Sequence, residues 1–203
     1  MRYPPFFDAV PRLRLRDPLA DFLGALEGGI VEYGYLDAVK LAGHSCPTVA
    51  GAYGLTRRAL DALWGGALAE RGALRVEFRD AREAGTTGVV AQVVSLVTGA
   101  APETGFKGIG GRFARRDRQA FGVELPLEIR YIRTDTGAAV DGVAQLRQVP
   151  ADPAMGELMQ RSLAGEASPE ETRRFGALWQ DRVRRILLEH GDDPTVFILQ
   201  PAA

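Results

Sequence analysis

The sequence has a single cysteine, Cys46, and only two histidines, His44 and His190. One cysteine excludes a disulfide within the chain and every zinc module that is built from paired cysteines. An excess of one charge is also missing, because 25 Lys+Arg residues nearly balance 26 Asp+Glu residues and leave a formal net charge of −1. A general nucleic-acid binder carries a basic excess, so we expect no nucleic-acid partner.

Long hydrophobic runs are absent as well. The most apolar stretch, residues 88–101, is interrupted by Gln92 and is shorter than the about 20 residues that a membrane helix needs. Residues 1–10 contain Pro4 and Pro5 and lack the apolar core of a signal peptide. A lone thiol also suits a reducing compartment. We therefore expect a cytoplasmic protein with no membrane partner.

The composition that remains is that of an ordinary globular protein, with 203 residues, 46% hydrophobic and 25% charged. Helical and extended patterns alternate irregularly, which predicts an α+β fold with a mixed or antiparallel sheet, packed helices and a helical C-terminal segment. We expect residues 1–150 to form the α+β core and residues 151–203 to form a C-terminal helical extension packed on it, as one domain overall.

Local signals predict the individual elements. Capping residues or apolar periodicity predict helices that begin at Asp17-Pro18, Pro47, Thr86, Asp152-Pro153 and Ser168. Alternation or β-forming residues predict extended segments at 30–41, 74–79, 127–131, 140–149 and 196–199. The last helix carries the capping box Ser168-x-x-Glu171, and His190 stands at its end, where a histidine can bond the last carbonyls.

The strongest local signal for chemistry is the turn His44-Ser45-Cys46-Pro47. Proline at the first helical position makes Cys46 the N-cap residue, where the helix dipole stabilises a thiolate. A neutral imidazole and a thiolate close together suit zinc, and they equally suit a nucleophilic thiol with a neighbouring base. A buried cysteine and a histidine that is hydrogen-bonded within the turn is the third interpretation. A metal held by His44 and Cys46 would lie in an open site, because a closed zinc site needs four protein ligands.

A second group of candidates lies in a glycine-rich segment. Thr98 and Gly99 come first, and Lys107 and Arg112 follow among glycines at 105–111. Glycines let the backbone approach a ligand, and the two cations favour a small anionic molecule, although such loops also serve as flexible connectors. The run of Arg112, Arg115, Arg116 and Arg118 predicts a solvated face, with an anion-facing rim as the alternative.

These two segments resemble a known family. Residues 43–47 are similar to the HGHxCPG motif of the E-subunit family of formylmethanofuran dehydrogenase, and Thr98-Gly99 with residues 105–108 is similar to its TGCTxGKGN segment. The resemblance spans residues 19–121. The sequence departs from the family pattern at Ala42, Thr48 and Ala100, which stand where the family has histidine, glycine and cysteine.

The resemblance implies an α+β core, a metal near the His/Cys turn and association as a homodimer. His44 and Cys46 carry over as metal positions, and Lys107 carries over as the loop lysine. We therefore expect a metal-associated protein, with zinc as the metal, that binds a small molecule through Lys107, Arg112, Thr98 and Gly99. The alternatives are a metal-free enzyme with Cys46 as nucleophile and His44 as base, and a non-catalytic interaction protein with a degenerate site.

Overall fold

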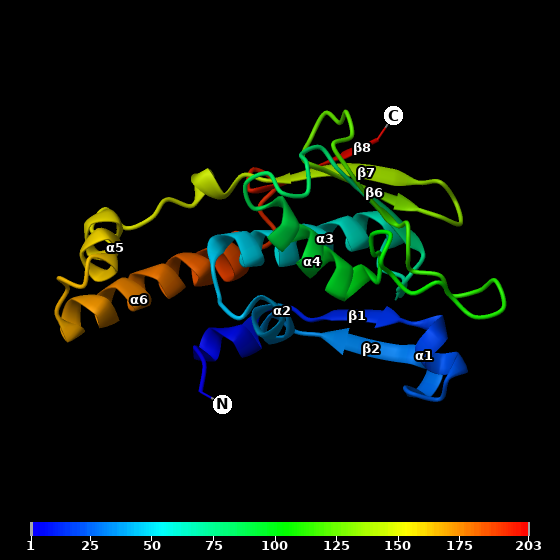
Figure 1. Cartoon of the computed structure of the whole chain (residues 1–203), viewed down its shortest axis with the longest axis horizontal. Helices are drawn as coiled ribbons and strands as arrows, with labels where there is room; N and C mark the ends of the chain where they lie inside the picture. The colour runs from blue at the N-terminus through cyan, green and yellow to red at the C-terminus, as the bar shows by residue number, and fades with distance from the viewer. Residues whose placement is uncertain (1, 203) are drawn as a thin grey trace.

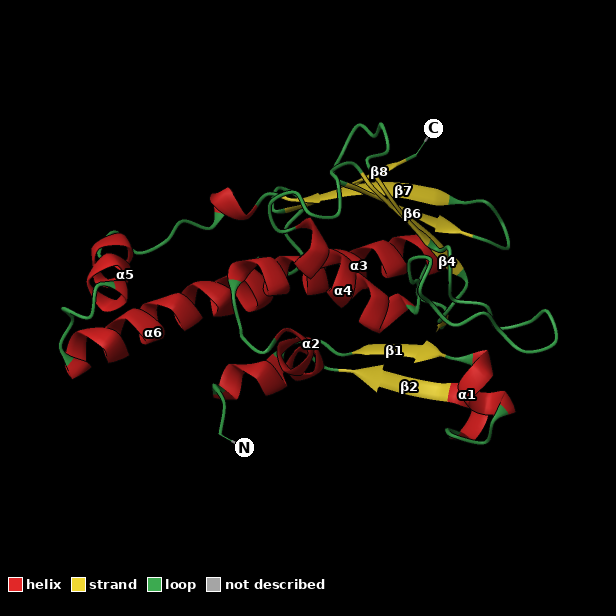
Figure 2. Cartoon of the chain, in the orientation of Figure 1, coloured by secondary structure: helices red, strands yellow, loops and turns green. Residues whose placement is uncertain are grey.

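A computed structural model describes residues 2–202 of the chain. The long helix α3 (Pro47–Trp64) lies with α4 (Thr87–Thr98) between two β-sheets (Figures 1 and 2). The other helices are α1 (Pro18–Phe22), α2 (Tyr35–Ala42), α5 (Met155–Leu163) and α6 (Pro169–Arg184). The strands are β1 (Leu13–Arg16), β2 (Ile30–Tyr33), β3 (Ala69–Glu70), β4 (Leu74–Phe78), β5 (Gln119–Phe121), β6 (Ile129–Arg133), β7 (Ala139–Ala144) and β8 (Phe197–Pro201).

Both sheets mix parallel and antiparallel pairs. The smaller sheet has the order β2-β1-β3, in which β1 is antiparallel to β2 and parallel to β3. The larger sheet has the order β5-β4-β6-β7-β8, and only its β4–β5 pair is parallel. The predicted α+β fold with a mixed sheet is therefore confirmed.

Helix α3 forms the centre of the core because ten of its residues are buried. Its buried residues run from Val49 to Leu60, and apolar side chains from both sheets and α4 pack with them. Cys46 caps its start and Gly65 ends it in the left-handed conformation. Its two ends therefore lie in different parts of the molecule, separated by its 18 residues, or about 27 Å at 1.5 Å per residue.

The expectation for residues 30–41 is wrong in its second half. The extended backbone ends with β2 at Tyr33, and α2 begins at Tyr35. The Asp37 carboxylate accepts a 2.8 Å hydrogen bond from the Gly34 backbone N–H, which fixes the start of this helix. The β-forming side chains of the segment do not override this local cap. The predicted extended segment 140–149 is also shorter, since β7 ends at Ala144.

The C-terminal segment is divided between a projection and the core. Helix α5 and the first half of α6 extend away from the sheets (Figure 1), with the predicted Ser168–Glu171 capping box in place. The later part of the segment returns to the core, where Val183 is fully buried and β8 pairs with β7. His190 bonds Asp193 Oδ2 through Nδ1 at 3.0 Å, so its ring is not spent on the helix carbonyls as expected.

None of the helices within residues 2–202 combines the length and the apolar content that crossing a lipid bilayer requires.

Candidate functional site

The turn before α3 has the predicted backbone. Its two candidate side chains, His44 and Cys46, do not face a common cleft. Cys46 is the N-cap, and its Sγ accepts a 3.5 Å hydrogen bond from the Val49 backbone N–H. The residue is 8% exposed and belongs to the hydrophobic core. His44 is exposed, with Nδ1 2.9 Å from the Ala42 carbonyl oxygen. The imidazole therefore lies in solvent while the sulfur is covered by the core.

This donor set does not fit a protein-held zinc ion. Across residues 2–202, no group of three or more His, Cys, Asp or Glu side chains is arranged to hold a metal. A catalytic zinc ion takes three protein ligands and a structural one takes four, whereas the turn offers His44 and Cys46 at most. A second chain or a ligand would have to complete the shell, and the zinc site stays a prediction from the sequence.

The glycine-rich segment is not brought to the His44–Cys46 turn. Arg112 lines a cleft together with Trp64, the last residue of α3, while the turn precedes the first residue of that helix. Lys107 is exposed on the same loop as Arg112 and does not line this cleft. The expected pocket between the turn and the loop therefore does not form, because α3 stands between its two halves.

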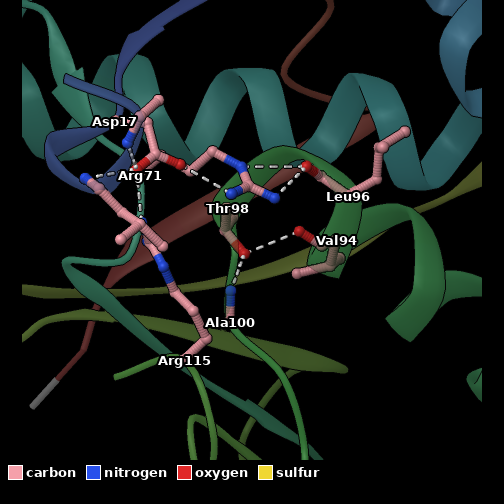
Figure 3. Close-up of polar contacts among 9 residues, drawn as sticks. Asp17, Arg71, Val94, Leu96, Thr98, Ala100 and Arg115 are labelled. Carbon is pink, nitrogen blue, oxygen red and sulfur yellow. Dashed lines mark hydrogen bonds and ion pairs between the residues drawn. The ribbon is translucent and has the colours of Figure 1, made fainter. Parts of the chain in front are cut away.

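Thr98 and Gly99 shape the loop from within and do not line this cleft. The fully buried Thr98 hydroxyl donates to the Val94 carbonyl at 2.7 Å and accepts from the Ala100 N–H at 3.1 Å (Figure 3). Both of its hydrogen-bonding roles are thus filled by the backbone at the end of α4. Thr98 therefore stabilises the end of α4, whereas the sequence led us to expect a contact with a ligand.

The cleft that Arg112 lines is rich in arginine. Its volume is about 670 Å³, within the range of small-molecule sites. Six arginines line it against two carboxylates: Arg16, Arg71, Arg112, Arg115, Arg118 and Arg133 against Glu70 and Asp135. Its walls come from the loop before β5, the end of α3, the end of β6 and the segment between β3 and β4.

The carboxylate of Asp17 holds two of the arginines that line this arginine cleft. Its carboxylate caps α1, accepts a 2.8 Å bond from Arg71 Nη1 and accepts a 2.7 Å bond from Arg115 Nη2 (Figure 3). Burial opposes the charge of this carboxylate, but the hydrogen bond from Arg71 and the charge of Arg115 outweigh it and lower the pKa of Asp17. The single carboxylate of Asp17 thus orients both Arg71 and Arg115. Arg71 is fixed further because it also donates to the Leu96 carbonyl near the end of α4.

Arg115 is buried in the wall of this cleft. Its side chain is 8% exposed, yet Nε and Nη1 have no hydrogen-bond partner among residues 2–202. Burial lowers the pKa of this guanidinium, and the Asp17 carboxylate only partly offsets the effect. Leaving buried donors unpaired costs about 1–3 kcal/mol or more for a charged group, and both nitrogens are closed to solvent, so Arg115 supports the wall of the cleft without offering them to a ligand.

Two glycines make room for this guanidinium. A side chain at Gly72, whose φ is +94°, would overlap Arg115 Nη1, and one at Gly99 would come within 2.9 Å of the same atom. Gly72 also donates its N–H to the Thr98 carbonyl at 2.7 Å. Gly99 thus serves the arginine cleft as a spacer, which differs from the direct ligand contact expected from the sequence.

Two arginines of the cleft, Arg112 and Arg118, have no carboxylate partner among residues 2–202. The ion pairs of this loop join Glu103 to Arg82, Arg115 to Asp17 and Arg116 to Asp117, and none within residues 2–202 involves Arg112 or Arg118. Arg112 is exposed and Arg118 half-buried. Arg112 and Arg116 are exposed, as the predicted solvated face requires, whereas Arg115 is buried against Asp17. The anion-facing rim stays a prediction for Arg112 and Arg118, which line the cleft.

Aromatic side chains complete the lining. The guanidinium of Arg133 lies 4.4 Å from the centre of the Trp64 ring, and that of Arg112 lies 4.7 Å from the Phe113 ring. Phe113 adopts a φ of +64°, which costs a non-glycine residue of order 1–3 kcal/mol and is enriched at functional sites. Its ring also contacts Phe22 of α1 at 5.2 Å, which ties the loop to the element that Asp17 caps.

Comparison of the chain with models of protein families and with curated proteins finds no match. The resemblance to the formylmethanofuran dehydrogenase E-subunit family therefore rests on the motif residues alone. It stays a prediction, as do the zinc ion and the homodimer that it implies and the cytoplasmic location expected from the composition.

Proposed function

We propose that this protein binds a small anionic molecule in the arginine cleft. The observation that carries the proposal is the pair Arg112 and Arg118, which line the cleft and have no carboxylate partner among residues 2–202. Both lie on the loop that Arg115 anchors through its 2.7 Å bond to Asp17. The sequence predicts an anionic ligand on this loop, and Arg112 is the residue that this prediction and the cleft share.

The electrostatics favour a ligand with more than one negative charge. Asp17 compensates one of the two arginines that it touches, and Asp135 is engaged by Arg133 at 2.6 Å. Arg16 pairs with Asp21 at 3.2 Å. Arg112, Arg118 and one of the two arginines at Asp17 therefore stay without a compensating carboxylate, and their positive charges repel one another in a partly enclosed site. Charge-assisted hydrogen bonds to a phosphate or carboxylate are the strongest that arginine makes, so a multiply charged anion relieves this repulsion and satisfies the free donors together.

Calorimetric titration with inorganic pyrophosphate tests the proposal. We expect binding at one site that weakens as salt is added. Replacing Arg112 and Arg118 by Gln removes two charges that make no ion pair, so the fold is retained. Because a hydrogen bond to a charged group contributes about 1.5–3 kcal/mol, each replacement should weaken binding roughly tenfold or more.

The matched control replaces Arg173 and Arg174 by Gln. These are two exposed arginines of α6 that do not line the cleft. This variant has the same net charge as the Arg112→Gln, Arg118→Gln protein and should bind pyrophosphate as the parent chain does. Equal losses in the two variants would show a general charge effect, and undetectable binding to the parent chain would exclude pyrophosphate-like anions from the cleft. Either result overturns the proposal.

A further inference from the structure

The cleft is much larger than the anion that its arginines require. Its volume is about 670 Å³, whereas a phosphate group occupies a small fraction of such a space, since one water molecule takes about 30 Å³ in the liquid. A ligand that fills it needs a body attached to the charged group. The chemistry of the remaining walls then decides what kind of body fits.

Part of the wall is a stacked pair of planar side chains, Trp64 and Arg133, which belong to other segments of the chain than the arginine-rich loop. Trp64 ends α3 and Arg133 ends β6, and both line the cleft with the guanidinium over the indole at 4.4 Å. Arg133 is fixed in place, because it donates to the Leu63 carbonyl at 3.1 Å and to both oxygens of Asp135. A planar ring that joins such a stack gains π and cation–π contact without needing a specific pattern of hydrogen bonds.

The other lining groups match the part of a ligand between a charged end and a flat end. Glu70 is half-exposed, and its closest cation, Arg16, is 3.9 Å away. Its carboxylate is thus open to accept hydrogen bonds from hydroxyl groups. Apart from Asp135, which Arg133 occupies, it is the only carboxylate among the residues of 2–202 that line the cleft.

We infer that the ligand of the arginine cleft is a mononucleotide-sized phosphate ester, with its phosphate on Arg112 and Arg118 and a planar base against the Trp64–Arg133 stack. The inference rests on the proposed anion-binding function and adds the class of ligand to it. The two parts of the site come from separate segments of the chain, so they can be removed independently.

The test compares AMP with ribose 5-phosphate, which differ only in the base. The chain has two tryptophans, and Trp179 lies on α6, where it donates to the Ser45 carbonyl. A Trp179→Phe background therefore leaves Trp64 as the only indole reporter. We expect AMP to quench its fluorescence and to bind roughly tenfold more tightly than ribose 5-phosphate, which is the effect of stacking one base on an aromatic side chain.

The control is Trp64→Leu in the otherwise native chain. This variant should lose the tenfold preference for AMP over ribose 5-phosphate, because the base loses the ring on which it stacks. Equal affinity for AMP and ribose 5-phosphate without quenching overturns the inference while pyrophosphate binding still supports the anion site. Absence of binding to all three compounds overturns both. Much tighter binding of decathymidylate than of AMP would assign the cleft to single-stranded nucleic acid and would also overturn the inference.

Discussion

Arg115 Nη2 donates a 2.7 Å hydrogen bond to Asp17 Oδ1 across 98 positions of the sequence. Asp17 begins α1, and Arg115 lies on the loop between α4 and β5, so this contact joins the N-terminal sheet region to the loop that carries the free arginines. The buried ion pair and the arginine cleft are therefore one structure, and changes to Asp17 should alter both stability and anion binding.

Asp17→Asn tests the ion pair without removing the helix cap, because asparagine is as good an N-cap as aspartate. The substitution leaves Arg71 and Arg115 without their carboxylate. Breaking a buried pair by removing one partner costs about 3–5 kcal/mol, and we expect a loss of that order in the free energy of unfolding, measured with urea. The control is Asp21→Asn, whose exposed pair with Arg16 at 3.2 Å should contribute no more than about 1 kcal/mol. Equal effects of the two substitutions would contradict the role assigned to Asp17.

The pH dependence of stability follows from the same carboxylate. The pKa of Asp17 is lowered in the folded protein from its ordinary value of 3.8, so the unfolded chain binds its proton first as the pH falls. The stabilisation is fully present above about pH 4 and is lost as the pH falls through the folded-state pKa. The difference in unfolding free energy between the parent chain and Asp17→Asn should therefore be constant near neutrality and shrink below pH 4. A difference that stays constant down to pH 2 would show that Asp17 does not carry it.

The elements that local rules determine could be predicted from the sequence. Asp17-Pro18, Cys46-Pro47 and Ser168-x-x-Glu171 each place a cap at the start of a helix, and the structure has all three caps. The helix at Thr87–Thr98 follows from apolar periodicity and the stop at Gly99. In these cases the determining contacts lie within a few residues of one another.

The candidate site could be predicted only in part, because its determinants are distant in the sequence. The arginine run at 112–118 is visible, but which of its members is buried depends on Asp17 and on the space over Gly72. Trp64 and Arg133 meet only when α3 and β6 pack together. His44 and Cys46 are separated by one residue in the sequence but diverge in the fold, since the N-cap position directs the sulfur to the core while the imidazole stays in solvent.

Gly72→Ala should uncouple Arg115 from the cleft. The new methyl group would overlap the guanidinium, which must then leave its position. The matched control is Gly24→Ala, since Gly24 also has a positive φ, +66°, but nothing within 4 Å of the added carbon. Both variants bear the backbone strain of about 1–2 kcal/mol, and only Gly72→Ala should lose pyrophosphate binding in the calorimeter. Retained binding in Gly72→Ala would show that the position of Arg115 does not set the geometry of the loop that carries Arg112 and Arg118.

Alkylation of Cys46 tests the alternative of a nucleophilic thiol. The sulfur is 8% exposed and accepts a backbone hydrogen bond from Val49, whereas reactive cysteines are partly exposed in electropositive surroundings. We expect iodoacetamide to modify the folded protein roughly tenfold or more slowly than the urea-unfolded chain, because modification requires local opening. Faster reaction in the folded state, with a rate that His44→Ala reduces, would restore the thiol-enzyme hypothesis.

Zinc content provides the decisive test of the family resemblance. The sequence motif predicts a metal at His44 and Cys46, while the chain supplies at most these two ligands at the turn, fewer than the three of an open zinc site. If a homodimer completes the shell, purified protein should contain close to one zinc per site by elemental analysis, and Cys46→Ser should abolish both the metal and the dimer in sedimentation. Cys46→Ser keeps a good N-cap, so the helix start is preserved. Zinc near zero in the parent chain and in the variant would leave Cys46 as a helix cap and the arginine cleft as the site of function.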